Sequence, residues 1–539
     1  MSTGTMSPYQ SGQRPGRDDF PHLLRAEWTK FRTVRGWVIA MVAAAVLTGL
    51  AVVALAGIGG GQQNPGAHPV AAIGPGGQAV TDHFYFVRQS LAGHGSITVR
   101  VTSLADNELP GQGLPAHYLP AQPWAKAGII IKAGTKPGSA YAAVMVTPGH
   151  GVRMQYDFTH DAAGLAGPVS AASPRWLRLT RSGDTVTGYD SADGTHWAEI
   201  GTARLAGLPA TAQAGLFAAS PQYLQAVQQF ANNNNAFYDT QATAAFDHVR
   251  LTGGQPGGAW RGGVIGFPTG PGGQRDISRC GPSGQDCRKI GSAPAARFSQ
   301  AAGRFTLSDS GGDIAPYITD VDPLGLVLKG SLIGLIAVIA LGAMFITAEY
   351  RRGLIRTTFS ASPRRGRVLA AKAVVIGSAT FVAGLVGAAI AVPIAERKLH
   401  AGGWVSSVFP VWSLTSGHGL QIVLGTAALL AVAAVLALCA GAVLRSSAGA
   451  ITAGVVVLIV PLLLAVVLPQ GPGDWLLRLT PAAAFGLQQG TPHYSQVMSF
   501  CQPYNGCFPL SPWYGFAVLC VWAAAGLALA TYLLRRRDA

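Results

Sequence analysis

The sequence predicts a mixed fold: a six-helix α-helical transmembrane domain with an extracellular antiparallel β-sandwich inserted between spans 1 and 2. Hydrophobic residues make up 49% of the 539 residues and charged residues only 12%, about half the charged fraction of an ordinary soluble protein. The apolar residues gather in six long runs, whereas residues 59–323 read as short β-rich segments separated by Gly, Pro, Asn and Asp.

The six apolar runs are predicted to cross a membrane. Each has about 20 residues or more, which at 1.5 Å per residue spans a hydrocarbon core of about 30 Å. Five carry no charge, and the sixth contains only Lys329, near its outer end. The first run starts too far from the N-terminus and is too long for a signal peptide, so it is predicted to be retained. The predicted spans are residues 37–58, 324–347, 373–395, 420–444, 449–468 and 513–534.

Positive charges beside the spans predict the orientation. Seventeen Lys and Arg residues flank the spans on one side, and three lie in the short loops of the other side. The N-terminal segment 1–36, the loop 348–372 and the tail 535–539 are therefore predicted to be cytoplasmic, in a multi-pass protein of the cell membrane. The segments 59–323 and 469–512 are predicted to lie outside.

Two pairs of cysteines agree with this orientation. Cys280 and Cys287 lie in the first outer segment, and Cys501 and Cys507 lie in the last outer loop. Each pair is close enough in sequence for a local disulfide, which an oxidising exterior permits. No CxxC or paired-His spacing occurs, so no metal site is predicted.

The outer segment is predicted to form an antiparallel β-sandwich, because its apolar positions alternate along short strands with turn residues between them. Residues 176–184 and 189–197 read as two strands joined by a Gly-Asp turn, with a second turn following. Here the sequence resembles the concanavalin A-like lectin/glucanase sandwich, over about residues 82–252. A Gln/Asn-rich insert at 222–241 and a Gly/Pro-rich stretch at about 253–294 depart from the resemblance and are predicted to be loops.

This outer domain is not predicted to be an enzyme. Glycoside hydrolysis needs two carboxylates facing each other about 5 to 10 Å apart, and the only Glu residues of the segment are Glu108 and Glu199. The candidates for binding a carbohydrate or cell-wall ligand are the aromatic residues Trp124, Tyr141 and Trp197. The alternative is that these aromatic residues form the core.

The cytoplasmic side carries three motifs. Residues 25–32 (RAEWTKFR) form a predicted amphipathic helix suited to the inner interface, and a basic anchor that only orients the first span is the alternative. Residues 349–358 (EYRRGLIRTT) follow the second span, and residues 362–367 (SPRRGR) lead into the third. With six spans and cytoplasmic ends, these motifs resemble the permeases of type-2 (ABC-2) ABC exporters, especially the actinobacterial group.

The resemblance implies a permease subunit without catalytic residues of its own. The chain lacks the GxxxxGK[ST] loop that cradles ATP phosphates, so ATP and Mg²⁺ would bind a separate ATP-binding subunit, and a second permease copy or paralogue would complete the path. A cytoplasmic loop that binds only anionic lipid heads is the alternative. By position in the family, the residues that contact the ATPase would be Glu27, Trp28, Lys30, Arg32, Glu349, Tyr350, Arg351, Arg352, Gly353 and Arg356.

Two other classes of function are alternatives to the permease. The net charge of +15 could suggest nucleic acid, but the short-loop charges lie beside apolar runs, so membrane lipid is the expected partner and nucleic acid is not. A membrane-anchored surface protein that uses its sandwich as a lectin is the other alternative. An anchor would need only one span, whereas this chain has six predicted spans. One feature departs from the permease pattern: type-2 permeases usually have a short first outer loop, and the first outer segment of this chain is long.

Overall fold

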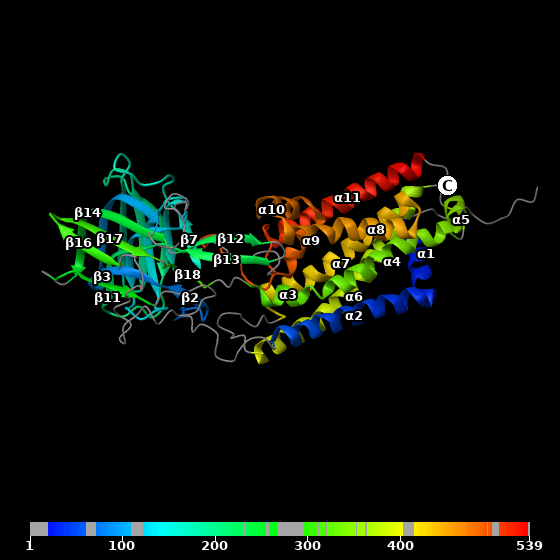
Figure 1. Cartoon of the computed structure of the whole chain (residues 1–539), viewed down its shortest axis with the longest axis horizontal. Helices are drawn as coiled ribbons and strands as arrows, with labels where there is room; N and C mark the ends of the chain where they lie inside the picture. The colour runs from blue at the N-terminus through cyan, green and yellow to red at the C-terminus, as the bar shows by residue number, and fades with distance from the viewer. Residues whose placement is uncertain are drawn as a thin grey trace, which may run out of the picture.

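The computed structural model has two parts: a bundle of long helices, and a β domain at one end of that bundle (Figure 1). The N-terminal helix α1 (Phe20–Thr33) and the C-terminal end of α11 (Pro512–Arg536) lie at the other end of the bundle. The structure describes residues 20–536 except 61–71, 109–121, 230–231, 239, 255–257, 267–295, 311, 318–320, 352, 362–363, 403–413, 469, 493 and 498–505.

Six helical segments of the described chain are long and apolar enough to cross a membrane. They run over Arg35–Ile58, Pro323–Arg351, Arg365–Ala401, Gly417–Leu444, Ser447–Ala465 and Pro512–Arg536. Besides α1 and α11, the helices are α2 (Arg35–Gly60), α3 (Pro323–Leu328), α4 (Ser331–Arg351), α5 (Leu354–Ala361), α6 (Arg365–Ala401), α7 (Gly417–Leu444), α8 (Ser447–Leu458), α9 (Val460–Val467), α10 (Gln470–Leu479) and the 3-10 helix η3 (Pro481–Gln488).

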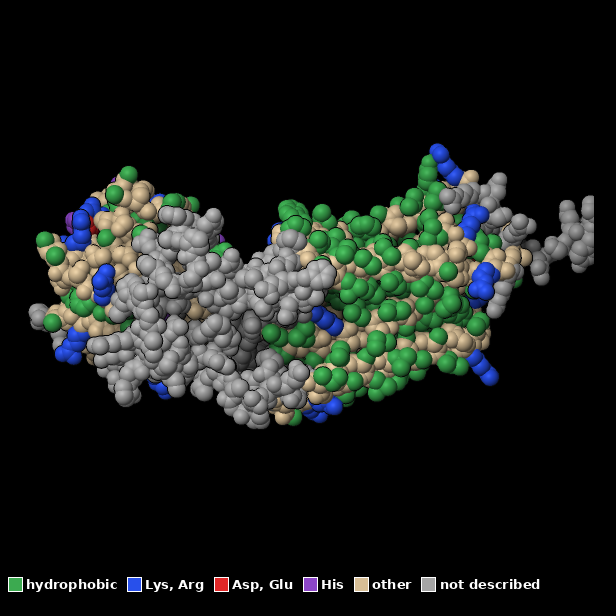
Figure 2. All heavy atoms as spheres, in the orientation of Figure 1, with side chains coloured by type: hydrophobic (Ala, Val, Ile, Leu, Met, Phe, Trp, Pro, Cys, Tyr) green, Lys and Arg blue, Asp and Glu red, His purple; other side chains and the backbone are tan. Residues whose placement is uncertain are grey.

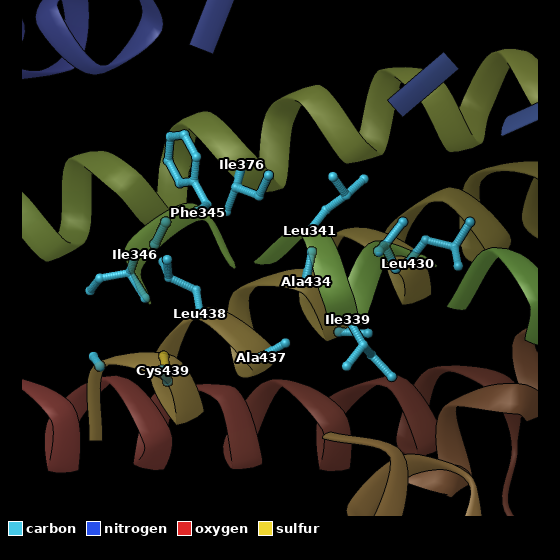
Figure 3. Packing of buried hydrophobic residues seen from close by; sticks show 14 of the residues in the cluster. Ile339, Leu341, Phe345, Ile346, Ile376, Leu430, Ala434, Ala437, Leu438 and Cys439 are labelled. Carbon is cyan, nitrogen blue, oxygen red and sulfur yellow. The ribbon is translucent and has the colours of Figure 1, made fainter. Parts of the chain in front are cut away.

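The core of the bundle lies between α4, α6 and α7. Side chains of α4 interleave with side chains of α7 and with Ile376 of α6 (Figure 3). The close approach of α4 to α7 depends on Gly342, because a Cβ at this position would lie 2.2 Å from the carbonyl oxygen of Ala434. Small residues at such contacts let helix backbones pack tightly, as they do in membranes.

The outer surface of the bundle is apolar, as a membrane-spanning surface requires. Figure 2 shows hydrophobic side chains covering the bundle between its ends, with Lys and Arg side chains near the ends. Exposed apolar residues on α2, α6 and α11 include Ile39, Leu50, Val382 and Val521. Because such a surface would aggregate in water, the bundle is built for a lipid environment.

Two prolines inside the predicted spans differ in their effect on the helices. Pro461 falls at the start of α9, directly after α8 ends at Leu458, so the predicted fifth span is divided into two helices. Pro393 stays inside α6, which continues to Ala401. Proline removes one backbone N–H donor and crowds the preceding turn, which accounts for the break at Pro461.

The β domain lies in the chain between α2 and α3, and all of its paired strands are antiparallel. Its strands are β1 (Ala72–Ile73), β2 (Ala79–Asp82), β3 (Phe84–Glu108), β4 (Lys126–Lys132), β5 (Tyr141–Thr147), β6 (Gly151–Tyr156), β7 (His160–Ala163), β8 (Arg175–Ser182), β9 (Thr185–Ser191), β10 (Ala198–Arg204), β11 (Ala212–Ala219), β12 (Tyr223–Gln229), β13 (Asn232–Tyr238), β14 (Thr240–Gly254), β15 (Arg261–Ile265), β16 (Arg297–Ala301), β17 (Arg304–Ser310) and β18 (Ile314–Pro316).

The long strand β3 divides the main sheet into two halves. Its first residues pair with β11 and β15, which continue through β4, β5, β6 and β7. Its later residues pair with β8 and β14, which continue through β9 and β10 and through β17 and β16. One hydrophobic cluster contains buried residues from both halves, such as Ile129 of β4 and Leu179 of β8. The concanavalin A-like assignment stays a prediction.

A small sheet of β1, β2 and β18 packs against the β4–β5–β11 half. Two carboxylates, on Asp82 at the end of β2 and on Asp313 directly before β18, form ion pairs with lysines that project from β4. Lys132 Nζ lies 2.7 Å from Asp82 Oδ2, and Lys126 Nζ lies 2.6 Å from Asp313 Oδ1, with both lysine side chains fully buried. The β4–β5–β11 half is therefore covered on both faces.

The Gln/Asn-rich insert, predicted to be a loop, contains the paired strands β12 and β13. This hairpin lies between the β domain and the bundle (Figure 1). A side-chain contact also joins the two parts, since Gln496 Nε2 donates to the carbonyl oxygen of Phe158 at 3.3 Å. The Gly/Pro-rich stretch falls largely outside the described residues.

Candidate functional site: a buried charge cluster

Four charged side chains from three helices meet at the end of the bundle that carries α1. Lys372 of α6 lies between two carboxylates, with its Nζ 2.7 Å from Glu27 Oε2 of α1 and 2.6 Å from Glu349 Oε1 of α4. The Lys372 side chain is 1% exposed, and the side chains of Glu27 and Glu349 are 4% and 13% exposed. One buried ammonium therefore ties α1 and α4 to α6.

Lys30 completes the cluster from its solvent side. Its Nζ lies 2.9 Å from Glu27 Oε1 and 3.3 Å from Glu349 Oε1, while its side chain is 46% exposed. Partial burial acts to lower the pKa of the Lys30 ammonium, but its hydrogen bonds and the charges of both carboxylates outweigh this, and the pKa lies above its usual value. Two carboxylates and two ammonium groups leave the cluster without net charge, which makes its burial feasible.

Aromatic rings close the apolar side of the cluster. The Lys372 Nζ lies 5.0 Å from the ring centroid of Phe345, within the range of a cation–π interaction. Phe31 of α1 and Trp37 of α2 pack edge-on against the same ring, at centroid distances of 6.1 and 5.6 Å. Glu27 and Phe31 lie four residues apart and so share one face of α1, the face that docks on the bundle.

The other face of α1 is exposed and basic. Trp28 is 44% exposed and stacks on Phe31 at 5.9 Å. Arg25 and Arg32 are exposed as well, while α1 carries no acidic residue in its first turn. An amphipathic helix that is fixed by an internal ion cluster thus presents an aromatic and cationic surface outward.

The structure separates the ten predicted contact residues into two groups. Trp28, Lys30, Arg32, Arg351 and Gly353 are exposed, so their side chains or backbone are available to a partner. The φ of +67° at Gly353, where α4 gives way to α5, is one that glycine adopts without strain.

The side chains of the remaining five predicted residues are buried or half-buried, or lie outside the described residues. The prediction of Glu27 as a surface contact is wrong, because its carboxylate is buried among Lys30 and Lys372; Glu349 is largely buried in the same way. Tyr350 is half-buried under Arg445, whose guanidinium carbon lies 5.4 Å from its ring centroid. Arg352 lies outside the described residues, as does the side chain of Arg356.

Sequence reasoning missed Lys372 as a member of the site and counted it only as a basic residue beside the third span. One signal could have found it: Lys372 follows four apolar residues and opens a charge-free run. A lysine embedded in an apolar stretch at a membrane edge requires an acidic partner.

The predicted ligand-binding aromatics of the β domain are mostly in its core. Tyr141 is fully buried and Trp124 is 5% exposed, so a ligand cannot reach Tyr141 in this conformation. The Trp124 ring stacks on His150 at a centroid distance of 3.8 Å. Trp197 is half-buried, and the Arg178 guanidinium covers its ring at 3.8 Å.

Only part of the predicted disulfide set can be placed. Cys507 is disulfide-bonded, whereas Cys280, Cys287 and Cys501 lie outside the described residues. Within the described part of the chain, no group of three or more His, Cys, Asp or Glu residues could hold a metal ion.

A second buried carboxylate lies at the opposite end of the bundle. Asp322 accepts hydrogen bonds from the backbone N–H groups of Gly325 at 3.0 Å, of Gly490 at 2.6 Å and of Thr491 at 3.4 Å. Burial raises the pKa of Asp322 to about 6, although these N–H groups act to lower it. Asp322 thus caps α3 and fixes the segment after η3 to the start of the second span.

The family described as "ABC-2 family transporter protein" matches residues 211–539, which is more than half of the chain. The chain belongs to this ABC-2 transporter family. It is accordingly a multi-pass membrane permease of an ABC transporter, and permeases of this family work with an ATP-binding subunit. The match includes Glu349 and Lys372 but begins after α1 and α2, so Glu27 and Lys30 lie outside it.

Solved structures resemble parts of this ABC-2 protein only at low levels. A GH43 protein BlXynB mutant from Bacillus licheniformis shares 16% identity over 23% of this chain and 24% of its own, with a TM-score of 0.16. SCP-B, a member of the Eqolisin family of peptidases, shares 6% identity over 42% of this chain and 98% of its own, with a TM-score of 0.22. A Saccharomyces cerevisiae protein of unknown function shares 14% identity over 35% and 94%, with a TM-score of 0.19. No curated protein matches the chain.

Proposed function

We propose that this chain is the permease half of an ATP-driven exporter, coupled to a separate ATP-binding subunit through α1 and the turn between α4 and α5. The observation that carries the proposal is the buried charge cluster. It joins α1 to two candidate spans, while the opposite face of α1 stays exposed. A helix that served only as a lipid anchor would not need a buried ion pair to each of two spans.

In this proposal the exposed residues Trp28, Arg32 and Arg351 contact the ATPase, and the cluster transmits its movement. Because Lys372 holds Glu27 and Glu349 at the same time, a displacement of α1 is passed to the ends of α4 and α6. A second permease chain, identical or paralogous, completes the translocation path, and ATP and Mg²⁺ bind only to the partner subunit.

The proposal places both termini in the cytoplasm and the β domain outside the cell. The charge asymmetry of the short loops supports this orientation. The disulfide-bonded Cys507 supports it as well, since the adjacent Gly506 packs on Asp322 at the β-domain end of the bundle, and disulfides persist in oxidising compartments. Outside the cell, the β domain is available to cell-wall or carbohydrate ligands, and half-buried Trp197 is the remaining aromatic candidate.

The test is affinity purification of the tagged full-length chain in mild detergent, with mass spectrometry of the proteins that accompany it. A soluble ATPase should accompany the wild type and be lost from the Trp28→Ala/Arg32→Ala variant. The matched control is Arg536→Ala, which removes an exposed arginine at the same end of the bundle. If the ATPase accompanies all three proteins equally, the exposed face of α1 is not its contact surface.

The alternative class, a membrane-anchored lectin, makes the opposite prediction in the same experiment. Wall glycans or surface proteins would accompany the chain, no ATPase would, and the α1 substitutions would change nothing.

A further inference from the structure

Of the two Lys–Asp pairs in the β domain, one is completely closed to solvent. The side chains of Lys132 and Asp82 are both 0% exposed, with Nζ 2.7 Å from Oδ2. In the other pair the side chain of Asp313 is 11% exposed, and its Oδ1 lies 2.6 Å from the Nζ of Lys126. A fully buried ion pair loses the hydration of both charges, and only good geometry with further hydrogen bonds offsets that loss.

The hydrogen bonds of Asp82 are divided unequally between its two oxygens. Oδ2 accepts from the Lys132 ammonium and from the backbone N–H of Gly138, both at 2.7 Å. Oδ1 is buried and has no hydrogen-bond partner among the described residues. An unpaired carboxylate oxygen in a dry site is costly, and a reaction that removes Oδ1 removes this cost.

Aromatic rings surround the Lys132 ammonium. Its Nζ lies 5.5 Å from the ring centroid of Tyr141 and 5.4 Å from that of Phe158, and both of these residues are buried. Phe158 belongs to a turn in which Asp157 and Phe158 have φ values of 45° and 68°. Residues with a side chain rarely adopt such values, and backbone strain of this kind is concentrated at functional sites.

The same contact brings the two reactants of an amide bond together. An Nζ 2.7 Å from Oδ2 lies less than about 4 Å from Cγ of Asp82, because a C–O bond measures about 1.2 Å. Reacting atoms held about 3 to 3.5 Å apart are poised for reaction. Addition of Nζ to Cγ would place negative charge on Oδ2, where the N–H of Gly138 already donates, as a donor of an oxyanion hole does.

We infer that Lys132 and Asp82 form an intramolecular isopeptide bond once the β domain has folded. Nζ bonds to Cγ, the bond from Cγ to Oδ1 breaks, and Oδ2 stays as the amide oxygen that accepts from Gly138. Two of the three ammonium protons leave with Oδ1 as one water molecule, and the third stays on the amide nitrogen. Atoms and charges balance without an oxidant or any other co-reactant. A neutral amide replaces a buried ion pair that has one unpaired oxygen.

Asp157 supplies a second carboxyl group for the proton transfers. Burial raises the pKa of the Asp157 carboxyl, and the Lys132 ammonium acts to lower it, so the two groups lie within electrostatic reach of each other. A carboxyl group with a raised pKa is suited to exchanging protons. Here it carries protons from Nζ to the departing Oδ1.

The bond fastens β2 to β4, at positions that are 50 residues apart in the sequence. An early strand of the β domain is thereby fixed covalently to the main sheet. The inference does not rest on the proposed function, because the reaction depends neither on an ATPase nor on the side of the membrane.

The test is peptide mapping of the full-length chain, which is purified in mild detergent, reduced, denatured and digested with trypsin and chymotrypsin. Mass spectrometry should find a branched peptide that joins the segments around Asp82 and Lys132 and is lighter than their sum by one water molecule. Trypsin should not cleave after Lys132, because an acylated lysine is not its substrate. The Lys126–Asp313 pair of the same digest is the matched control. Solvent reaches Asp313, so these two peptides should be recovered unlinked.

Two variants accompany the wild type. Lys132→Arg keeps the positive charge but cannot form the bond, so it should lose the branched peptide and migrate more slowly in a denaturing gel, because the loop of 50 residues is open. Lys126→Arg, the matched change on the same strand, should keep both the peptide and the mobility. Asp157→Asn should lower the fraction of linked chains.

The wild-type digest decides the question even where a variant fails to fold. Recovery of the Lys132 and Asp82 peptides in unlinked form would overturn the inference. Loss of one water without the branched peptide would overturn it as well, because it indicates a succinimide at Asp82. Equal linkage of both lysine pairs would contradict the argument that complete burial and the unpaired Oδ1 select Asp82.

Discussion

Replacing Lys372 by Met tests the charge cluster most directly. The substitution keeps an unbranched apolar side chain but removes the ammonium that lies 2.7 Å from Glu27 and 2.6 Å from Glu349. Among the described residues, both carboxylates are then left buried with only Lys30 as an ion-pair partner. Removing one partner of a buried ion pair costs about 3–5 kcal/mol, because the remaining charge stays desolvated. We expect Lys372→Met to lower the free energy of unfolding by this amount.

Lys30→Met is the matched control, because Lys30 contacts the same two carboxylates. Its Nζ lies 2.9 and 3.3 Å from them, but its side chain is 46% exposed, and exposed ion pairs contribute only about 0–1 kcal/mol. The losses of unfolding free energy in Lys372→Met and in Lys30→Met should therefore differ by several kcal/mol. Burial, rather than distance, is the variable that separates them.

The assay is unfolding of the purified full-length chain, read by maleimide labelling of the Cys439 thiol, which is 1% exposed in the folded bundle. The triple variant Lys372→Met/Glu27→Gln/Glu349→Gln removes both stranded charges, so it should recover at least half of the lost stability. The reasoning is refuted if Lys372→Met costs no more than Lys30→Met. It is also refuted if the triple variant is no more stable than Lys372→Met alone.

Two further predictions address other parts of the bundle. Gly342→Ala places a Cβ 2.2 Å from the Ala434 carbonyl oxygen and should destabilise the bundle by about 1–3 kcal/mol. The control is Gly49→Ala, whose Cβ meets no atom within 4 Å and which should change stability by less than about 0.5 kcal/mol. Equal effects of the two substitutions in thermal unfolding would contradict the α4–α7 contact. For Asp322, the folded pKa of about 6 lies above the unfolded value of about 3.9, so its contribution is greatest at low pH and is lost as pH rises through 6. The wild type should therefore gain about 1 kcal/mol over Asp322→Asn between pH 7.5 and pH 5, and parallel pH profiles of the melting temperature would contradict this.

The sequence predicted the features that depend on local patterns and missed those that depend on contacts between residues far apart in the chain. Runs of about 20 apolar residues define spans by length alone. Each predicted run overlaps a candidate span of the structure, and only the fifth, 449–468, extends beyond its span, which ends at Ala465. The helix α6 extends beyond its predicted run, to Arg365 and Ala401, because hydropathy detects the hydrocarbon core and not the helical turns that continue into the interface.

Only part of the candidate site could be predicted from the sequence. The motifs at 25–32 and 349–358 contain three of the four residues of the charge cluster. Periodicity does not say which face of a helix docks, so the sequence did not show that Glu27, a predicted ATPase contact, faces the interior. The partner that buries it, Lys372, lies 345 residues away in sequence. In the β domain, Tyr141 is covered by β2 and β18, strands of four and three residues from opposite ends of the domain. Strands so short carry no alternating pattern to detect.

The composition of the charge cluster limits how the bundle can move. The cluster is electrically neutral, so it is stable when closed, but separating Glu27 from Lys372 leaves unlike charges apart in a buried site. A movement of α1 relative to α4 and α6 would have to break that contact, whereas a movement of all three helices together would not. The least costly motion is therefore one in which α1 and the adjoining ends of α4 and α6 shift as one body. In the proposed coupling, a force on the exposed face of α1 would reach α4 and α6 through Lys372.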